Sequence, residues 1–240
     1  MTPSQRNQDS ELAALLAPDI LVMLEESPGD VAAETEELHP KDLADVAEAM
    51  PTDRVAEFLR ALPAARAADV LEYLDEELRS ELLEAMSTEQ AVALVSEMTP
   101  DDRADILEEL EEETADEILQ DLPEAERQET ERLLQYDADS AGGLMTTEFV
   151  SVSQDLTSEQ ALVLVRVAAR SGRKEAMHAI YVTDDRGSVV GVMSLRELVA
   201  AAEDSKVADL AWTEVVKVPA TADRAEVARW RLGCAGRAGK

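Results

Sequence analysis

The stretch YDADSAGGLMTTEFVSV (136–152) separates two halves of the chain that differ in charge and in hydrophobic pattern. Residues 1–136 contain 38 acidic and nine basic side chains, a net charge of −29, whereas residues 137–240 carry −2. The pattern before the stretch is helical, and the pattern after it alternates short β-rich runs with helices. We therefore expect two domains, an ordinary number for 240 residues.

The composition excludes several classes of protein. A net charge of −31 repels nucleic acid and anionic lipid and attracts cations. The single Cys234 excludes an intrachain disulfide and a cysteine-based zinc site. No apolar run approaches the roughly 18 residues that cross a bilayer, and the N-terminus lacks a signal pattern, so we expect a soluble cytoplasmic chain. Acidity can also serve solubility alone, but that interpretation predicts acidity in both halves.

Large apolar residues recur every twelve positions in the first half. One series consists of Val46, Phe58, Val70, Leu82, Leu94, Ile106 and Ile118. A second series lies four residues later and consists of Met50, Leu62, Leu74, Met86, Met98, Leu110 and Leu122. The position before each member of the first series is acidic in six of seven units, the exception being Ala93. Apolar positions four apart share one helical face, so the repeat predicts a series of amphipathic helices.

Each unit of twelve leaves about eight or nine helical residues and a short turn. Prolines fall at or near the turns, where they fit a first helical turn, at positions 40, 51, 63, 100 and 123. Ser87 and Thr99 occupy N-cap positions, and STEQ (87–90) has the pattern of a capping box. Because helices this short are marginal alone, we expect an all-α superhelix over residues 38–135, preceded by a helical or partly disordered lead over residues 1–37.

The second half has the order β-α-β-β-α. Strands are expected at 148–152, 179–184 and 188–194, and helices at 157–170, with a Thr157–Gln160 capping box, and at 195–202. A strand at 214–218 and a helix starting at 221–229 then begin the pattern again. This order resembles a CBS (cystathionine-β-synthase-type) α/β module over residues 148–204, followed by an incomplete second module over residues 205–240. The last residues, WRLGCAGRAGK (230–240), lack the expected helix continuation and hairpin, and resemble a truncated or frameshifted end.

The opening stretch resembles the linker of MgtE-type magnesium transporters and channels, which has the pattern Y-x-x-D-S-A-G-x-L-M-T. The segments LHPKDLADV (38–46), GVMSLREL (191–198) and AEVAR (225–229) are also similar to that family. The resemblance covers residues 38–229 and none of the membrane part. It implies an α+β multidomain chain: a helical N domain, a linker over residues 136–147, one CBS domain and part of a second.

In the family that this chain resembles, the cytosolic region is a Mg²⁺ sensor. Mg²⁺ bridges carboxylates of the N domain, the CBS domains and a plug helix, and closes the pore when internal Mg²⁺ is high. The resemblance therefore implies Mg²⁺ as a ligand, the membrane domain of a full-length transporter at the cytoplasmic face of the membrane as a partner, and a homodimer through the CBS modules that is weak if they are truncated. Mg²⁺ keeps much of its water and uses few carboxylates per site.

Five carboxylates are candidate metal ligands. Asp101 and Asp105 lie four residues apart on one helical face, and the resemblance matches them to N-domain residues that share Mg²⁺ with the CBS side. Asp69, which occupies the repeat position of Asp105 in an earlier twelve-residue unit, is a weaker candidate. By the same resemblance, Asp223 and Glu226 match carboxylates of the second CBS module. An alternative for Asp101 is an acid favoured by the dipole at a helix N-terminus.

The segment GVMSLRE (191–197) resembles the CBS nucleotide pattern Gly-x-x-Ser/Thr-x-x-Asp. The resemblance gives Gly191 a close approach to an adenine nucleotide such as ATP, Ser194 a phosphate contact and Glu197 a ribose contact. Glu197 is one methylene longer than the usual Asp. The alternative is that Ser194 caps the helix that follows the strand.

No nucleophile motif, P-loop or dinucleotide fingerprint occurs, so we expect no enzyme. The leading hypothesis is the Mg²⁺-sensing cytosolic region of a magnesium transport protein, which gates transport when Mg²⁺ bridges acidic surfaces. The alternative is a free-standing helical-repeat and CBS adaptor that senses an adenine nucleotide. Downstream genomic DNA that encodes a plug helix and apolar spans in another frame would favour the first hypothesis.

Overall fold

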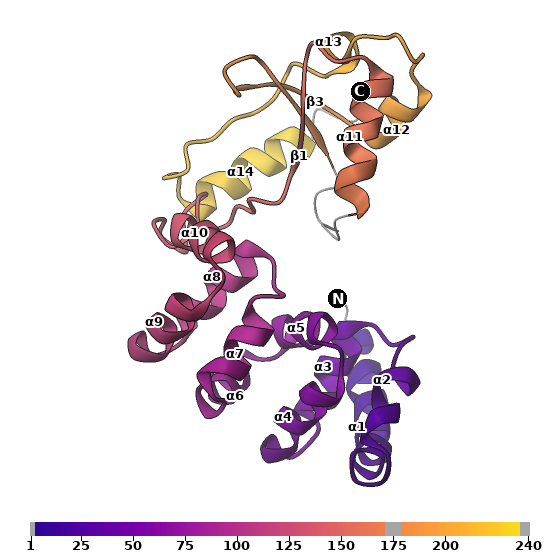
Figure 1. The fold of residues 1–240 in the computed structure, drawn as a ribbon, viewed down its shortest axis with the longest axis vertical. Helices are drawn as coiled ribbons and strands as arrows, with labels where there is room; N and C mark the ends of the chain where they lie inside the picture. Colours follow the sequence, from indigo (N-terminus) through magenta and orange to yellow (C-terminus); the bar gives the residue numbers. More distant parts are fainter. Residues whose placement is uncertain (1–2, 171–178, 236–240) are drawn as a thin grey trace. The chain divides into compact units, whose positions relative to one another are not determined.

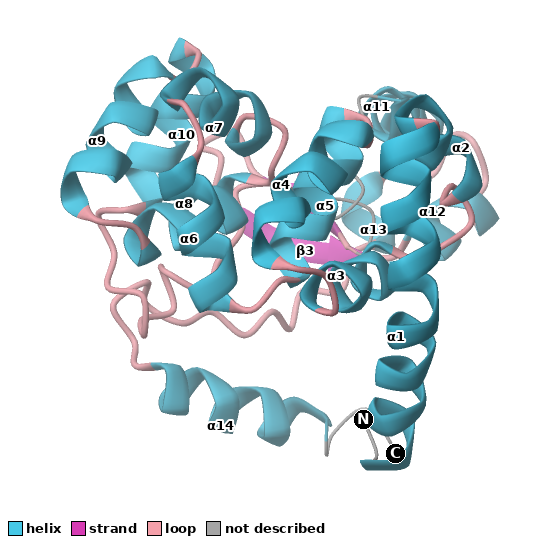
Figure 2. Ribbon diagram, turned by 90° about the horizontal axis from the view of Figure 1, so that it is seen from below, coloured by secondary structure: helices cyan, strands magenta, loops and turns pink. Residues whose placement is uncertain are grey.

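The computed structural model describes residues 3–170 and 179–235. The chain divides into two compact units, Met1–Gln135 and Tyr136–Lys240 (Figure 1). The first unit is helical, and the sheet belongs to the second. Figure 2 distinguishes the helices, which predominate, from the strands. Among the described helices, none combines the length and the apolar character that a membrane span needs.

The N-terminal unit begins with the long helix α1 (Pro3–Glu26). A short 3₁₀ turn, η1 (Pro28–Asp30), and the single turn α2 (Val31–Glu34) follow it. Helix α1 packs against α3 (Pro40–Glu48). Its inward side chains are buried: Ala13, Ala17, Ile20 and Leu24. The described part of the lead is therefore mostly helical and joins the core of this unit.

From α3 to α10, each helix begins twelve residues after the previous one. After α3 the helices are α4 (Thr52–Ala61), α5 (Ala64–Tyr73), α6 (Glu76–Ala85), α7 (Thr88–Val95), α8 (Pro100–Glu109), α9 (Glu112–Asp121) and α10 (Glu124–Leu133). Of the fourteen positions in the two apolar series, twelve are buried, and Met86 and Leu94 are half-buried. The twelve-residue helical repeat is confirmed.

The helix ends follow from local chemistry. The capping box at Ser87 is present, because its hydroxyl accepts from the Gln90 amide and the Gln90 side chain accepts from the Ser87 amide. Thr99 likewise accepts from the Asp102 amide, and Pro100 follows it at the first helical position. Five members of the second apolar series stand at helix C-caps with extended backbone, namely Leu62, Leu74, Met86, Leu110 and Leu122. The chain thus leaves each of these helices on a residue whose side chain is driven toward the core.

A buried arginine joins three of the later helices. Arg103 on α8 is 3 % exposed and donates hydrogen bonds to α7, to the turn after it and to α10. The acceptors are the carbonyl oxygens of Val95, Ser96, Met98 and Glu126 and the hydroxyl of Thr130. These bonds offset the cost of burying the guanidinium and tie the repeat units to one another.

The C-terminal unit contains a three-stranded sheet in the order β1-β2-β3. Strand β1 (Val150–Ser153) pairs in parallel with β2 (Ile180–Thr183), and β2 pairs antiparallel with β3 (Val189–Met193). Its helices are α11 (Ser158–Arg170), α12 (Leu195–Ala200), α13 (Val207–Leu210) and α14 (Arg224–Ala235). The capping box between Thr157 and Gln160 is present at the start of α11. The β-α-β-β-α order expected of a CBS module is confirmed.

Two local expectations for the C-terminal unit were wrong. Residues 213–219 form no strand, because this segment has no ladder partner; beside it, Trp212 makes an isolated bridge with Val192 of β3. The helix at 221–229 does not stop at Arg229, because α14 continues to Ala235. Three of the six residues of this continuation, Arg231, Leu232 and Ala235, are good helix formers, and one internal glycine costs only about 1 kcal/mol. The rest of the tail expected to be aberrant, 236–240, lies outside the described residues.

The stretch 136–152 packs against residues 220–224 within the C-terminal unit. The amides of Ala141 and Gly142 donate to the carbonyls of Ala222 and Ala220, each at 2.7 Å, and the Arg224 amide donates to Asp139 at 2.8 Å. A Cβ on Gly142 would lie 2.3 Å from the Tyr136 ring, so the ring requires glycine there. The distinctive sequence of this stretch thus follows from close packing.

Candidate functional site

Helix α8 places three carboxylates on one face. Asp101, Asp105 and Glu109 follow one another at four-residue spacing, so their side chains lie above one another along the helix. Helix α6 packs against α8 and carries Glu76 and Arg79. Thr99 and Pro100 start α8 at a defined residue and thereby set the direction in which these carboxylates point.

Arg79 forms a salt bridge with one of these carboxylates, that of Glu109. Its Nε donates to Oε2 of Glu109 at 2.8 Å, and Nη2 forms a second bond to Oε1 of the same carboxylate. The side chains of Arg79 and Glu109 are 13 % and 18 % exposed. Nη1 of Arg79 donates to the carbonyl of Glu72 at 3.0 Å. Among the salt bridges of the described residues, none involves Asp101 or Asp105.

Asp101 has an unsatisfied oxygen. Its Oδ1 is buried and finds no hydrogen-bond partner among the described residues. Leaving a buried acceptor unpaired typically costs about 1–3 kcal/mol, and more for a charged group. Asp101 also stands in the first turn of α8, where the helix dipole favours a negative charge. The dipole explains why a carboxylate is tolerated there, but it supplies no partner for Oδ1.

The neighbouring carboxyls hold their protons more tightly than usual. Partial burial raises the pKa of Asp105, and the negative charge of Asp101 raises it further, while Arg79 opposes both. Burial also raises the pKa of Glu109, against the hydrogen bond and charge of Arg79 and with smaller contributions from Glu76 and Asp105. Asp101 and Asp105 repel each other, and Arg79, which is hydrogen-bonded to Glu109, offsets the repulsion only in part, so a cation placed beside Asp101 and Asp105 would be stabilised.

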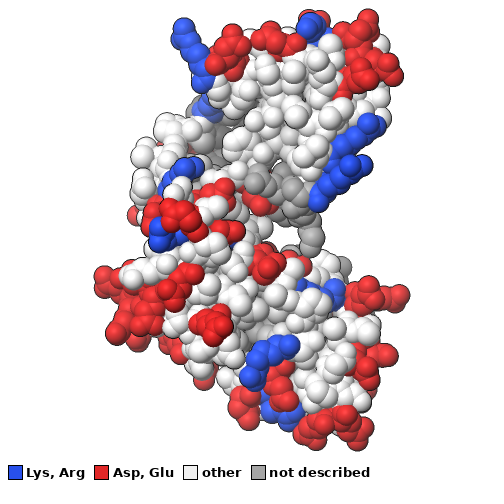
Figure 3. All heavy atoms as spheres, in the orientation of Figure 1, with Lys and Arg blue, Asp and Glu red and all other residues white. Residues whose placement is uncertain are grey.

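The other metal candidates lie on other elements. Asp69 is half-buried on α5. Asp223 and Glu226 are exposed at the start of α14 in the C-terminal unit, where Oδ1 of Asp223 accepts from the Ala225 amide at 2.7 Å. Within residues 3–170 and 179–235, no three Asp, Glu, His or Cys side chains gather closely enough to hold a metal ion. Figure 3 shows acidic side chains spread widely over the N-terminal unit in this view.

Sequence reasoning missed three members of the α8 cluster. Glu109 could have been found, because it continues the four-residue spacing from Asp105. Arg79 and Glu76 could not have been found, because they reach these carboxylates only through the packing of α6 on α8. Arg79 precedes its partner Glu109 by 30 residues in the sequence. The sequence alone does not state that pairing.

The nucleotide candidates form a helix cap. The Ser194 hydroxyl accepts from the Glu197 amide at 3.2 Å, and Oε2 of Glu197 accepts from the amide and the hydroxyl of Ser194 at 2.8 and 2.9 Å. The backbone and side-chain hydrogen bonds from Ser194 lower the pKa of Glu197. Gly191 is buried in β3, and a Cβ there would lie 2.8 Å from Cβ of Ala211. In the structure, these three residues serve the strand-to-helix junction.

Two family models match the chain. The MgtE intracellular N domain matches residues 38–139, and the CBS domain matches residues 141–204. The chain is 43% identical over 103 residues to the magnesium transporter MgtE of Thermus thermophilus, a match that covers 43% of this chain and 22% of that protein. The chain thus matches about a fifth of the length of this curated relative.

Two solved structures share the fold along most of the chain. The cytosolic domain of the Mg²⁺ channel MgtE in complex with ATP superposes with a TM-score of 0.83 at 32% identity, covering 92% of this chain and 89% of that one. The soluble part of a magnesium transporter also gives 0.83, at 25% identity, covering 94% of this chain and 88% of that one. The chain therefore belongs to the MgtE family and corresponds to its cytosolic region, an N domain followed by a CBS domain.

Proposed function

We propose that this chain is the Mg²⁺-sensing regulatory region of a magnesium transporter or channel. The observation that carries the proposal is the buried, unpartnered Oδ1 of Asp101, one helical turn from Asp105, whose pKa is raised. Two adjacent carboxylates that form no salt bridge among the described residues can hold an external cation. The names of the curated relatives and solved neighbours, all magnesium transport proteins, support Mg²⁺ as that cation.

The proposed chemistry needs few protein ligands. Mg²⁺ takes one or two carboxylates and fills its octahedron with water, so Asp101 and Asp105 can begin a site without a complete protein cage. Asp69 in the N-terminal unit, and Asp223 and Glu226 in the C-terminal unit, remain proposed as further ligands. Because unneutralised carboxylates repel one another, a divalent ion shared between acidic surfaces would draw them together. In a full-length transporter, that change would be the signal that gates transport.

Direct measurement of Mg²⁺ binding tests the proposal. Isothermal titration of the chain with MgCl₂ should give saturable binding that Asp101→Ala, Asp105→Ala removes. The matched control is Glu112→Ala, Asp116→Ala on α9, which deletes two exposed carboxylates at the same spacing. If both double variants bind Mg²⁺ equally, or the parent shows no saturation, the proposal fails and the acidity serves solubility.

We also propose that the CBS module associates with a second copy of the chain. Helix α11 exposes Val163, Leu164 and Val167, and the neighbouring α12 exposes Val199, all between 45 % and 62 %. Apolar side chains gathered on two contacting helices are typical of an interaction surface. The proposed dimer follows from this face together with the family membership.

A second candidate function is adenine-nucleotide binding, as in the adaptor hypothesis. It is favoured by the solved relative that is described in complex with ATP. In this chain Ser194 and Glu197 would have to exchange their capping bonds for ligand contacts. Titration with ATP, followed by intrinsic Trp fluorescence, tests this; Trp212 is exposed and its carbonyl accepts from the Val192 amide beside Gly191. An unchanged signal in both the parent and Glu197→Asp would remove this candidate.

A further inference from the structure

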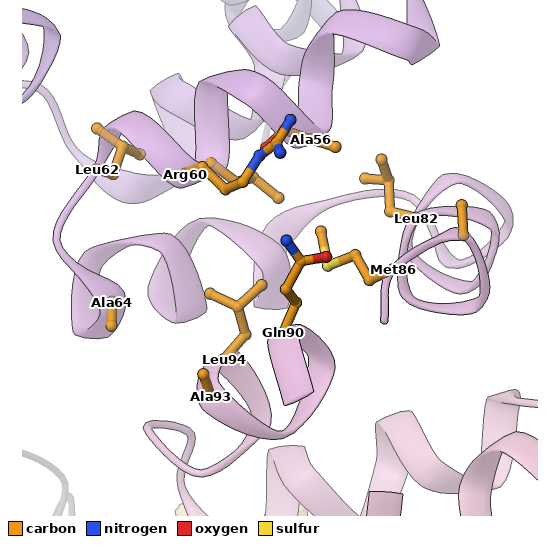
Figure 4. A pocket seen from close by; sticks show the side chains of 11 residues that line it. Ala56, Arg60, Leu62, Ala64, Leu82, Met86, Gln90, Ala93 and Leu94 are labelled. Atoms are coloured by element: carbon orange, nitrogen blue, oxygen red, sulfur yellow. The ribbon is translucent and has the colours of Figure 1, made fainter. Parts of the chain in front are cut away.

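The N-terminal unit contains a pocket away from the α8 carboxylates. It has a volume of about 320 Å³ and lies among α4, the start of α5, α6 and α7 (Figure 4). Its buried part is formed by Leu59, Leu62 and Leu82. Four alanines line it where longer side chains would fill the space: Ala56, Ala64, Ala85 and Ala93. This volume is at the lower end of the range for small-molecule sites, roughly 300–1,000 Å³.

The twelve-residue repeat changes character at this pocket. Met86 and Leu94 are the two members of the apolar series that are not buried, and both line the pocket. Ala93 is the one member of the acidic series that is not acidic, and it lines the pocket too. Three departures from an otherwise regular pattern thus meet in one place. The pocket therefore follows from the sequence of these twelve-residue repeats. In them the apolar side chains of Met86 and Leu94 stay partly exposed, and Ala93 replaces the usual carboxylate.

Two polar side chains at the pocket are hydrogen-bond donors. Nε of Arg60 donates to the Ala56 carbonyl at 3.0 Å, and no salt bridge of the described residues involves Arg60. The Gln90 oxygen accepts from the Ser87 amide at 3.2 Å, which leaves its NH₂ group to donate elsewhere. Figure 4 shows the guanidinium of Arg60 and the amide of Gln90 directed into the same space. None of the lining residues is acidic.

We propose that this pocket binds a small amphiphilic monoanion, a carboxylic acid with an apolar chain. The carboxylate would accept hydrogen bonds from Arg60 and Gln90, and the chain would cover Leu82, Met86 and Leu94. About ten non-hydrogen atoms fit the volume, taking roughly 30 Å³ for each water-sized group. Ligands with several negative charges are disfavoured, because one guanidinium faces a unit with a net charge of −29. The site is independent of the proposed Mg²⁺ response.

The test uses the full chain and three probes of nearly equal size: octanoate, octanol and octylammonium. Methyl NMR of Met86 and Leu94 reports occupancy directly at the pocket. We expect octanoate to shift both methyl signals with a Kd of about 1 mM or tighter. Octanol should bind at least about tenfold more weakly, and octylammonium weaker still, because neither supplies an acceptor charge for Arg60.

Two variants separate the contributions of charge and shape. Arg60→Gln should reduce octanoate binding about tenfold and leave octanol unchanged, because it removes the cation and keeps an amide donor. Ala93→Glu restores the acidic slot of the repeat and should abolish octanoate binding. The control is Ala125→Glu, which adds the same charge at an exposed position on α10 and should bind like the parent. Far-UV circular dichroism checks each fold; if Ala93→Glu is unfolded, the Arg60→Gln comparison decides.

Three results would overturn the proposal. The first is no shift of Met86 or Leu94 with octanoate near its solubility limit. The second is equal binding of all three probes, which would describe a non-specific apolar surface. The third is an octanoate affinity that is the same in Arg60→Gln as in the parent, because the carboxylate would then not be recognised by Arg60.

Discussion

Arg79 on α6 donates two hydrogen bonds to Glu109 on α8, one to each oxygen of its carboxylate. This pairing joins two residues that lie 30 positions apart in the sequence and connects α6 to α8. It also decides the electrostatics of α8, because the guanidinium is bound to Glu109 while Asp101 and Asp105 share the same face. Asp101 and Asp105 are therefore the two carboxylates of this face that we propose as Mg²⁺ ligands.

Arg79→Ala should destabilise the N-terminal unit strongly. Both side chains are largely buried, and removing one partner of a buried pair typically costs about 3–5 kcal/mol. Chemical denaturation followed by circular dichroism measures the change. The double variant Arg79→Ala, Glu109→Ala should recover a large part of the loss, because no uncompensated carboxylate remains. A double variant as unstable as the single one would show that the packing of Arg79, and not the ion pair, holds α6 to α8.

The raised pKa values of Asp105 and Glu109 predict how stability depends on pH. Both carboxyls hold protons more tightly in the folded state than their ordinary values of 3.8 and 4.5, so the folded state binds more protons in the window above those values. Their contribution to stability should therefore be fully present below the ordinary values and be lost as pH rises through the folded pKa values. Thermal melts without Mg²⁺ should show the melting temperature rising as pH falls from neutrality.

Asp105→Asn isolates this contribution. The variant cannot titrate at that position, so its melting temperature should rise less than that of the parent over the same pH interval. Glu197, whose pKa is lowered, acts in the opposite direction in the C-terminal unit, and therefore the comparison must follow the melting of the N-terminal unit. Parallel pH profiles for parent and variant would show that Asp105 is not a contributor.

The exposed apolar face of α11 predicts weak self-association. Sedimentation velocity should show a monomer–dimer equilibrium that shifts with protein concentration across the micromolar range. Val163→Asp, Val167→Asp places two charges on this face and should keep the chain monomeric. Leu12→Asp is the control, because it adds a charge at another exposed apolar position, on α1. A dimer that survives the α11 change but not the α1 change would place the interface on α1.

Much of this fold could be predicted because its signals are local. The spacing of Val46, Phe58 and Val70 is visible in the sequence, and each helix does begin twelve residues after the last. The prediction of a strand at 214–218 was wrong. The β-branched residues of this segment favour a strand, but a strand also needs a hydrogen-bonded partner along its backbone. Strand propensity depends on neighbouring residues in the sequence, whereas strand pairing depends on residues that are far apart in it.

The candidate site divides in the same way. The spacing of Asp101 and Asp105 predicts a shared helical face, and α8 has it. The packing around α8 determines that an oxygen of Asp101 is buried without a partner. Arg79 reaches α8 from α6, which belongs to another twelve-residue repeat of the same unit. No sequence periodicity states either fact. The features of the candidate site on which the proposal rests are therefore those that tertiary packing creates.

Mg²⁺ should stabilise the chain more than K⁺ does at matched ionic strength. Both salts screen the net charge of −31, but only the divalent ion can be held by paired carboxylates. A ligand that binds only the folded state at 100 times its Kd adds about 2.7 kcal/mol, which sets the scale of the expected rise in melting temperature. Differential scanning calorimetry in MgCl₂ and in KCl measures the difference.

Asp101→Ala, Asp105→Ala should remove most of that difference. The variant should also be slightly more stable than the parent without Mg²⁺, because like charges at this spacing cost roughly 0.2–0.5 kcal/mol and because the buried Oδ1 is deleted. Glu112→Ala, Asp116→Ala should keep the Mg²⁺-specific rise, since those carboxylates are exposed on α9. The opposite signs in the first variant, greater stability without Mg²⁺ and a smaller response to it, distinguish a sensor site from general acidity. If K⁺ reproduces the whole effect in the parent, the carboxylates of α8 serve solubility and a different part of the chain must sense the ion.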